Sequence, residues 1–346
     1  MNKNHTKKSL KIYILIAVCV FLISYMAIAY SSSFGNKLEY DSNPEIEVIL
    51  EDEKNDLEEK TDNQTVNQNV NAEDKIVVTH IKTPDPLKAL YMSAWVAGSK
   101  DFRNSLVKIV DDTELNAVVI DIKDSTGKIS FHLDDPEIEK YGSTENRIRN
   151  VKSVIDTLHS KNIYVIGRIS VFQDPYMTKA KPEWAIKRLS DGGVWKDRKG
   201  LSFLDPTKKE VHDYIVNLAK ESYNLGFDEI NLDYIRYPSD GNMKDINYNL
   251  KEGKSRADNI EDFFKYFSSE LKKEISIPLS ADLFGLTTEA VDDMGIGQVW
   301  EKALPYFDYL CPMVYPSHYP AGYSSFTNPA AHPYEVIDRS IKGAIS

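Results

Sequence analysis

The chain has 346 residues, of which 27% are charged and 11% aromatic, and its formal net charge is −11. This length suffices for one large domain with a tail. The negative charge argues against a nucleic-acid-binding protein, which needs a basic face. The two cysteines, Cys19 and Cys311, stand in an apolar N-terminal run and a distant strand-like run, so we expect no structural disulfide.

The sequence of residues 1–30 predicts that the protein is exported from the cytoplasm. Four lysines precede an uncharged run at residues 12–30. At 1.5 Å per residue this run just spans the core of a bilayer. Lysines before it and acidic residues after it predict a single-pass membrane anchor with an extracytoplasmic domain. A cleaved signal peptide, and hence a secreted protein, is the alternative, because Ala27-Ile28-Ala29 fits a small-x-small cleavage site.

Residues 31–75 have the composition of a linker. They include the segment EDEKNDLEEKTDNQTVNQNV, which is rich in Glu, Asp and Asn. Such a segment cannot bury enough apolar surface to offset the entropy lost on ordering. We expect a disordered stalk here, without a binding role, followed by a domain at residues 76–346.

From residue 88 onward, short apolar or β-branched runs alternate with amphipathic segments. This alternation predicts parallel strand-helix units. No glycine-rich loop follows the first strand, so a (β/α)₈ TIM-type barrel is favoured over a dinucleotide-binding fold. Six strands are found, and we expect the last two strand-helix units to be absent from this sequence. The predicted strands are 90–96, 117–122, 163–170, 229–235, 278–284 and 309–315, and the predicted helices are 102–111, 145–160, 208–224, 258–274 and 298–306.

Side chains alternate between the two faces of a strand, so their parity separates the barrel interior from the helix-facing side. The interior positions near the strand ends are polar or aromatic, and active sites of such barrels lie at that end. A single buried Asp usually has a structural role, but several converging charges favour a functional site, because unpaired buried charge costs several kcal/mol. The predicted interior residues are Trp95, Asp121, Lys123, Arg168, Ser170, Asn231, Asp233, Ser280, Asp282, Met313 and Tyr315.

Several segments also carry a family resemblance. They are, in order, AVVIDIKDSTGKISF, IGRISVFQDP, LSFLDPTKKEV, GFDEINLDYIRYPSDG, LSADLFGLTT, MGIGQVWE and DYLCPMVYPSHY. Together they resemble the "putative glycosyl hydrolase domain" family from about residue 87 to the end. The resemblance implies a TIM barrel related to retaining glycosidases of the α-amylase type. By strand order it implies that Asp233 is the nucleophile and Asp282 the acid/base, although α-amylases use a Glu for the second role.

The implied reaction is attack of Asp233 on the anomeric carbon while protonated Asp282 donates to the leaving oxygen. A retaining enzyme holds the two carboxyl groups about 5–5.5 Å apart, and an inverting enzyme about 6.5–9.5 Å. Nearby arginines favour an ionised nucleophile, and an apolar setting favours a neutral acid. The candidate substrate-binding residues are Trp95, Asp121, Lys123, Arg168, Asn231, Arg236, Tyr315 and His318, and further candidates for stacking on sugar rings are Phe172, Trp195, Tyr234 and Tyr319.

The substrate class implied is a polysaccharide or oligosaccharide. We expect no metal and no other cofactor, because metal-ligand spacings such as HxxxH, HxH or clustered Cys are missing from the sequence. The absence of GxSxG disfavours a serine esterase. A non-catalytic carbohydrate-binding barrel at the cell surface remains an alternative. Another is a barrel enzyme of a different reaction with Lys123 as its base, although Lys123 fits better as a partner of Asp121 or Asp124.

Overall fold

The computed structural model describes residues 78–345. These residues belong to the unit that begins at Glu73, whereas the unit Met1–Ala72 lies outside the described residues. The predicted membrane segment 12–30 and the linker 31–75 therefore also lie outside them. Among the residues that are described, no helix combines the length and apolarity needed to cross a membrane.

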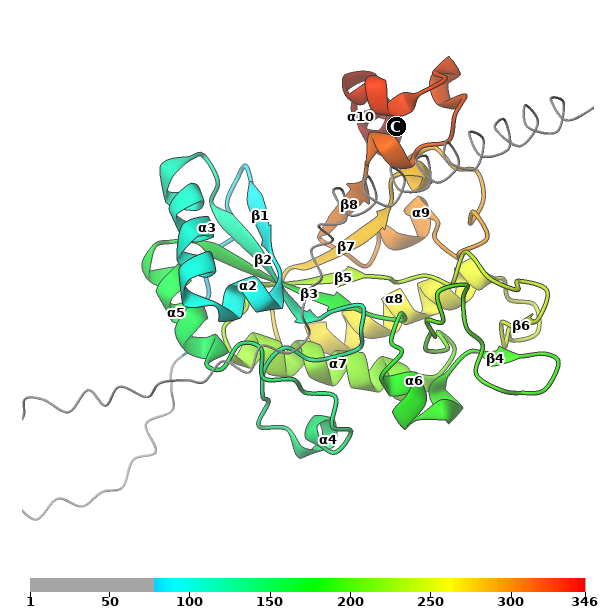
Figure 1. The fold of residues 1–346 in the computed structure, drawn as a ribbon, viewed down its shortest axis with the longest axis horizontal. Coiled ribbons are helices and arrows are strands. Elements are labelled where there is room, and N and C mark those ends of the chain that lie inside the picture. The colour runs from blue at the N-terminus through cyan, green and yellow to red at the C-terminus, as the bar shows by residue number, and fades with distance from the viewer. Residues whose placement is uncertain (1–77, 346) are drawn as a thin grey trace, which may run out of the picture. The chain divides into compact units, whose positions relative to one another are not determined.

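A six-stranded parallel sheet forms the centre of the domain, in the order β1-β2-β3-β5-β7-β8 (Figure 1). Each strand pairs in parallel with the next one in the sheet. The α/β class and all six predicted strands are confirmed, and the sheet is a half-barrel consistent with a TIM-barrel glycosidase fold. The strands are β1 Ala89–Met92, β2 Ala117–Lys123, β3 Tyr164–Ser170, β5 Glu229–Asp233, β7 Leu279–Phe284 and β8 Tyr309–Met313.

Helices follow the strands as the alternating pattern predicts. The helix α8 begins with a capping box, in which Ser255 and Asp258 each bond the other's backbone N–H. The helix α7 ends just before Gly226, whose φ of 110° allows the reversal that closes the helix. The helices are α2 Ala94–Gly98, α3 Lys100–Asp112, α4 Pro136–Glu139, α5 Val151–Ser160, α6 Met177–Ala180, α7 Lys209–Asn224, α8 Arg256–Lys272, α9 Trp300–Ala303 and α10 Pro333–Ile345, and a small antiparallel pair joins β4 Lys187–Arg188 to β6 Ile246–Asn247.

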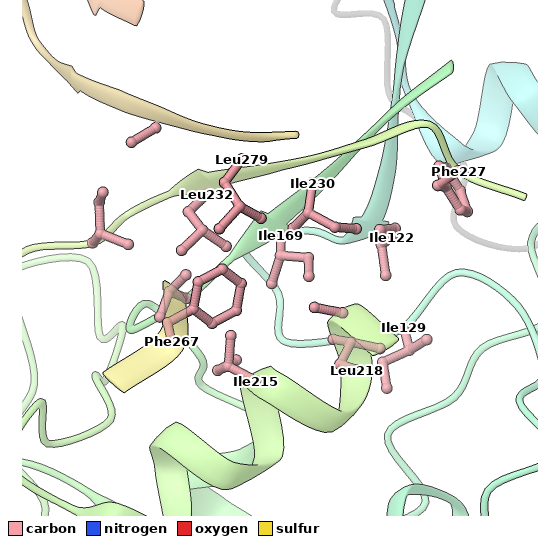
Figure 2. Close-up of a cluster of buried hydrophobic side chains, with 14 of the residues drawn as sticks. Ile122, Ile129, Ile169, Ile215, Leu218, Phe227, Ile230, Leu232, Phe267 and Leu279 are labelled. Atoms are coloured by element: carbon pink, nitrogen blue, oxygen red, sulfur yellow. The ribbon is translucent and has the colours of Figure 1, made fainter. Parts of the chain in front are cut away.

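The hydrophobic core lies between the sheet and its helices. Figure 2 shows side chains of β2, β3, β5 and β7 meeting those of α7 and α8. The predicted helix-facing residues of the strands are in this core, and burying each large side chain contributes about 1.5–3 kcal/mol. Gly167 permits close packing, because a Cβ there would lie 2.3 Å from Cδ1 of Ile122. The core residues labelled are Ile122, Ile129, Ile169, Ile215, Leu218, Phe227, Ile230, Leu232, Phe267 and Leu279.

Several element boundaries differ from the prediction. The first strand ends at Met92 rather than at residue 96, because Ser93 caps α2 and its Oγ accepts from the backbone N–H of Val96. The predicted helix 145–160 begins only at Val151, where Asn150 is the N-cap. The predicted strand 90–96 thus ends early because a capping hydroxyl redirects the chain locally.

The fourth predicted strand, 229–235, is also shorter than expected. It ends at Asp233, because Tyr234 adopts the left-handed conformation with a φ of 52°. A non-glycine residue in this region is uncommon and interrupts strand alternation. By strand parity Tyr234 would face the helices together with Ile230 and Leu232, and its positive φ makes that expectation wrong.

Candidate active site

Three aspartates converge on one guanidinium at the carboxyl end of the sheet. Arg168 on β3 places Nη1 2.7 Å from Oδ1 of Asp121 on β2. Its Nη2 lies 2.5 Å from Oδ2 of Asp233 on β5. Its Nε lies 3.9 Å from Oδ2 of Asp282 on β7. The predicted convergence of these four residues is thus confirmed, although the sequence could not show that Arg168 is its centre.

Strand register explains the convergence. Asp121 is level with Arg168 in the pairing of β2 with β3. Between β5 and β7, Leu232 is level with Ala281, so the residues that follow, Asp233 and Asp282, share the next level and the same face. Neighbouring strands lie about 4.7–4.9 Å apart. The two candidate catalytic carboxylates therefore stand side by side on adjacent strands.

Two donors contact the carboxyl group of Asp233. Besides the Arg168 contact, Oδ1 of Asp233 accepts a hydrogen bond of 2.5 Å from the backbone N–H of Tyr234. Burial opposes the charge of Arg168, but the carboxylates of Asp233 and Asp121 raise the pKa of its guanidinium above the usual value. Arg168 therefore stays positive beside the carboxyl group of Asp233.

The surroundings of Asp282 favour its protonated form. Burial, followed by the negative charge of Asp233, raises the pKa of Asp282 to about 7. A hydrogen bond of 3.0 Å from Nδ2 of Asn231 to Oδ1 of Asp282 acts against this shift, as does Arg168. Near neutral pH a large fraction of Asp282 is therefore protonated. A carboxyl group that stays protonated near neutral pH is suited to act as a general acid.

Tyr91 belongs to this cluster and was missed. Its hydroxyl donates a hydrogen bond of 2.5 Å to Oδ2 of Asp121, and its ring lies 6.0 Å from Cζ of Arg168. Burial, and then this hydrogen bond, raises the pKa of Tyr91, so the hydroxyl remains a donor. Strand parity could have indicated Tyr91, because it has the same parity as Trp95 along the first predicted strand and so lies on the predicted interior face.

A buried polar ladder below Asp282 joins Asn231 and Ser280, which were predicted to face the interior, to Glu229, which was missed. Asn231 donates to Oγ of Ser280 at 3.1 Å, and Ser280 donates to Oε1 of Glu229 at 2.6 Å. Tyr164 donates to the other oxygen of Glu229 at 3.1 Å. Glu229 shares the parity of Asn231 and Asp233, which is the signal that could have found it.

A cavity of about 210 Å³ opens beside Asp233. Arg236 lies on its wall, with Cζ 5.5 Å from the ring centroid of Tyr234 and 5.2 Å from that of Phe284. The predicted binding residues Arg236, Tyr315 and His318 all line this cavity. Aromatic rings beside a hydrogen-bonding cation form a wall suited to a sugar ring, which has apolar faces and polar edges.

Lys123 does not reach the cluster. It is fully buried, and its Nζ lies 2.7 Å from Oδ2 of Asp174, which is equally buried. The pairing of β2 with β3 shifts register between Asp121 and Lys123, so the period-2 rule fails at that point. The prediction that Lys123 points inward beside Asp121 is wrong, and its pairing with Asp121 or Asp124 is replaced by pairing with Asp174.

The predicted aromatic residues divide into two groups. Trp95 lies on α2 instead of a strand, is 56% exposed, and has Cζ of Arg147 4.9 Å from its ring. Trp195, expected in an open polar loop, is buried, and its Nε1 donates to the backbone oxygen of Asn242 at 3.1 Å. Phe172 and Tyr319 are buried as well. The burial of Trp195, Phe172 and Tyr319 corrects the expectation that their rings face a sugar, whereas the binding role of Trp95 stays a prediction.

A parallel α/β half-barrel with carboxylates at the carboxyl ends of its strands is consistent with the TIM-barrel fold of glycosidases. Residues 89–346 match the family described as "Putative glycosyl hydrolase domain", and the chain belongs to this family. Family membership identifies it as a glycosidase acting on a carbohydrate. The resemblance inferred from the sequence segments is thereby confirmed.

Solved structures similar to this chain agree with that fold. A hypothetical protein from Ruminiclostridium thermocellum is 36% identical, with a TM-score of 0.52, over 56% of this chain and 96% of that one. The PgaB (BpsB) glycoside hydrolase domain from Bordetella bronchiseptica is 12% identical, with a TM-score of 0.53, over 75% of this chain and 80% of that one. Comparison with curated proteins gave no match.

Proposed function

We propose that this chain is an extracytoplasmic glycoside hydrolase that cleaves a polysaccharide by a two-carboxylate retaining mechanism, with Asp233 as nucleophile and Asp282 as acid/base. The observation that carries the proposal is the pairing of these two residues on adjacent strands with opposite electrostatic settings. Arg168 and the Tyr234 N–H each donate to a carboxylate oxygen of Asp233. Burial favours protonated Asp282.

The spacing supports retention over inversion. Neighbouring strands lie about 4.7–4.9 Å apart, so side chains at the same level and on the same face of β5 and β7 start about that far apart. Retaining enzymes need a separation of about 5–5.5 Å between the carboxyl groups, whereas inverting enzymes need room for a water molecule between them. Asp233 also faces the cavity lined by Arg236, Tyr315 and His318, where a sugar ring would lie.

The proposed reaction has two steps. In the first, an oxygen of Asp233 forms a bond to the anomeric carbon as the glycosidic C–O bond breaks. The leaving oxygen takes the proton of Asp282. In the second step Asp282, now ionised, accepts a proton from water, and the resulting hydroxide displaces Asp233 from the anomeric carbon. Both carboxyl groups return to their starting protonation states.

The proposed location rests on the sequence alone. Lysines before residues 12–30 and acidic residues after them support a single-pass anchor, and the cleavage-like Ala27-Ile28-Ala29 supports secretion instead. Protease treatment of intact cells tests export, because an extracytoplasmic domain is degraded while a cytoplasmic marker survives. Protection of the domain would contradict the proposal. The apparent mass of the cell-bound chain separates an anchor from a cleaved peptide.

One observation favours a second candidate, a non-catalytic carbohydrate-binding barrel. Arg168 already pairs with both Asp121 and Asp233, as in a structural ion cluster. In that case the cavity would hold a glycan without turnover. The binding function needs the aromatic wall and Arg236 but not an ionisable Asp282.

Hydrolysis of a panel of polysaccharides and aryl glycosides by the full chain in detergent separates the two functions. Asp233→Asn should abolish turnover while glycan binding remains. Asp338→Asn on the exposed helix α10 is the matched control and should retain full activity. Wild-type chain that binds a glycan but never turns it over would favour the binding function.

A further inference from the structure

A second cavity, of about 400 Å³, adjoins the first. Both cavities have Tyr234 and Arg236 in their walls. The volume lies within the range of roughly 300–1,000 Å³ that is typical of ligand pockets. Tyr234 and Arg236 therefore form a common wall, so a ligand bound beside Asp233 can extend past them into the second cavity.

The second cavity lies along the same edge of the sheet. Its residue Ser125 follows β2, Gln173 follows β3, and Ser239 follows β5. The first cavity is formed instead by residues at the ends of β5, β7 and β8, such as Phe284 and Tyr315. The two cavities thus follow one another along the carboxyl ends of the strands, with Tyr234 and Arg236 between them and Asp233 in the wall of the first.

The wall of the second cavity offers both donors and acceptors. Ser125 and Ser239 contribute hydroxyl groups, and Gln173 contributes an amide. Lys199 and Asp240 are exposed and lie on the same wall, so a cation and an anion are both present. This mixture does not favour a charged ligand, because Lys199 would repel a cation and Asp240 would repel an anion. It suits a ligand with many hydroxyl groups, each of which both donates and accepts.

The same cavity has an apolar side. Leu201 and Phe203 contribute to it from the loop that follows β4. Phe203 is buried, and its ring centroid lies 6.4 Å from that of Trp195, so the core supports this side. A sugar ring presents C–H groups on its faces and hydroxyls at its rim, which matches one apolar side and a polar wall.

We propose that the second cavity is a distal subsite for an uncharged, hydroxyl-rich sugar residue of the same glycan chain that is cleaved between Asp233 and Asp282. This inference rests on the proposed function. The substrate is accordingly an oligosaccharide or polysaccharide long enough to pass Tyr234 and Arg236. A single sugar with an aryl leaving group occupies the first cavity and leaves the second one empty.

The double substitution Lys199→Ala with Asp240→Ala in the full chain tests the subsite. Both residues are exposed and lie outside the catalytic cluster. The probes are cello-, malto-, xylo- and N-acetylchito-tetraose with their 4-nitrophenyl monoglycosides, compared within the series that wild type hydrolyses. We expect kcat/KM on the tetrasaccharide to fall about tenfold, mainly through KM, because hydrogen bonds to the distal sugar are lost. The monoglycoside should be hydrolysed at the wild-type rate.

A matched control is the double substitution Lys251→Ala with Glu252→Ala. This exposed pair lines neither cavity and should leave both substrates unaffected. Unchanged hydrolysis of the tetrasaccharide by the Lys199/Asp240 variant, or an equal loss on both substrates, would overturn the subsite. If wild type hydrolyses no probe, the proposed function fails, and calorimetric titration with the four tetrasaccharides then tests the subsite. Weaker binding by the variant supports it, and wild-type affinity overturns it.

Discussion

Asn231 and Asp282 face each other from adjacent strands, with Nδ2 of Asn231 donating to Oδ1 of Asp282 at 3.0 Å. The same amide bonds Ser280, which in turn bonds Glu229. Glu229 is a buried carboxyl group whose own pKa is raised by burial. Asp282 is thus connected to Asn231, whose hydrogen bond stabilises the ionised form of Asp282. Through Ser280 it is also connected to Glu229, whose negative charge disfavours that form. The remaining titratable groups that act on Asp282 or are acted on by it are Asp233, Arg168 and Cys311.

Asn231→Leu should move the pH profile to higher pH. The substitution removes the hydrogen bond that favours ionised Asp282, so the pKa of Asp282 should rise above about 7. The proposed acid works when protonated, so activity is lost as pH increases through this pKa. The basic limb of kcat/KM should therefore shift to higher pH. A shift to lower pH would contradict the assignment of Asp282.

Glu229→Gln should produce a smaller shift in the opposite direction. It removes a negative charge that raises the pKa of Asp282 but keeps a side chain able to bond Ser280 and Tyr164. The basic limb of kcat/KM should move to lower pH. The opposite signs for Asn231→Leu and Glu229→Gln distinguish control of Asp282 from a general loss of stability, which would move neither limb. Circular dichroism confirms that each variant is folded.

Asp282→Asn should depend on the leaving group. A general acid contributes about 10²–10⁴-fold to the rate. The loss should be near this size on natural oligosaccharides, whose leaving oxygen needs a proton. It should be much smaller on 2,4-dinitrophenyl glycosides, whose leaving group departs as a stable anion. The quantity to compare is the rate constant of the first step. Equal losses on both substrates would show that Asp282 is not the acid.

Arg168→Gln should destabilise the domain in a pH-dependent way. The guanidinium lies among three carboxylates, and breaking a buried ion pair costs about 3–5 kcal/mol. At pH 5 Asp282, whose pKa is raised to about 7, is protonated, so the carboxyl groups repel one another less than at pH 8. The free energy of unfolding from urea titration should therefore fall more at pH 8 than at pH 5. A loss that is the same at both values would mean that Arg168 contributes through packing alone.

Period-2 alternation predicted much of the site because it depends only on the local chain. Arg168, Asn231 and the aspartates 121, 233 and 282 all lie on the predicted face. The rule failed where the backbone departs from regular strand geometry. Lys123 follows a register shift, and Tyr234 has a positive φ. Neither departure has a Gly or Pro to signal it in the sequence.

Contacts between strands were harder to predict. The Tyr91–Asp121 bond and the Ser280–Glu229 bond each join residues on neighbouring strands, at distances of 2.5 Å and 2.6 Å. Parity gives the face of each residue but not its level relative to the next strand. Register is set by core packing, such as the close approach of Ile122 to Gly167, which no local pattern encodes.

The central claim is that Asp233 attacks the anomeric carbon beside Asp282. Proton NMR of the first product formed from an oligosaccharide of known anomeric configuration tests it most directly. The adjacent-strand geometry predicts that the product initially has the configuration of the substrate and then mutarotates. An initial product of inverted configuration would contradict the account, because water and not Asp233 would then be the attacking group.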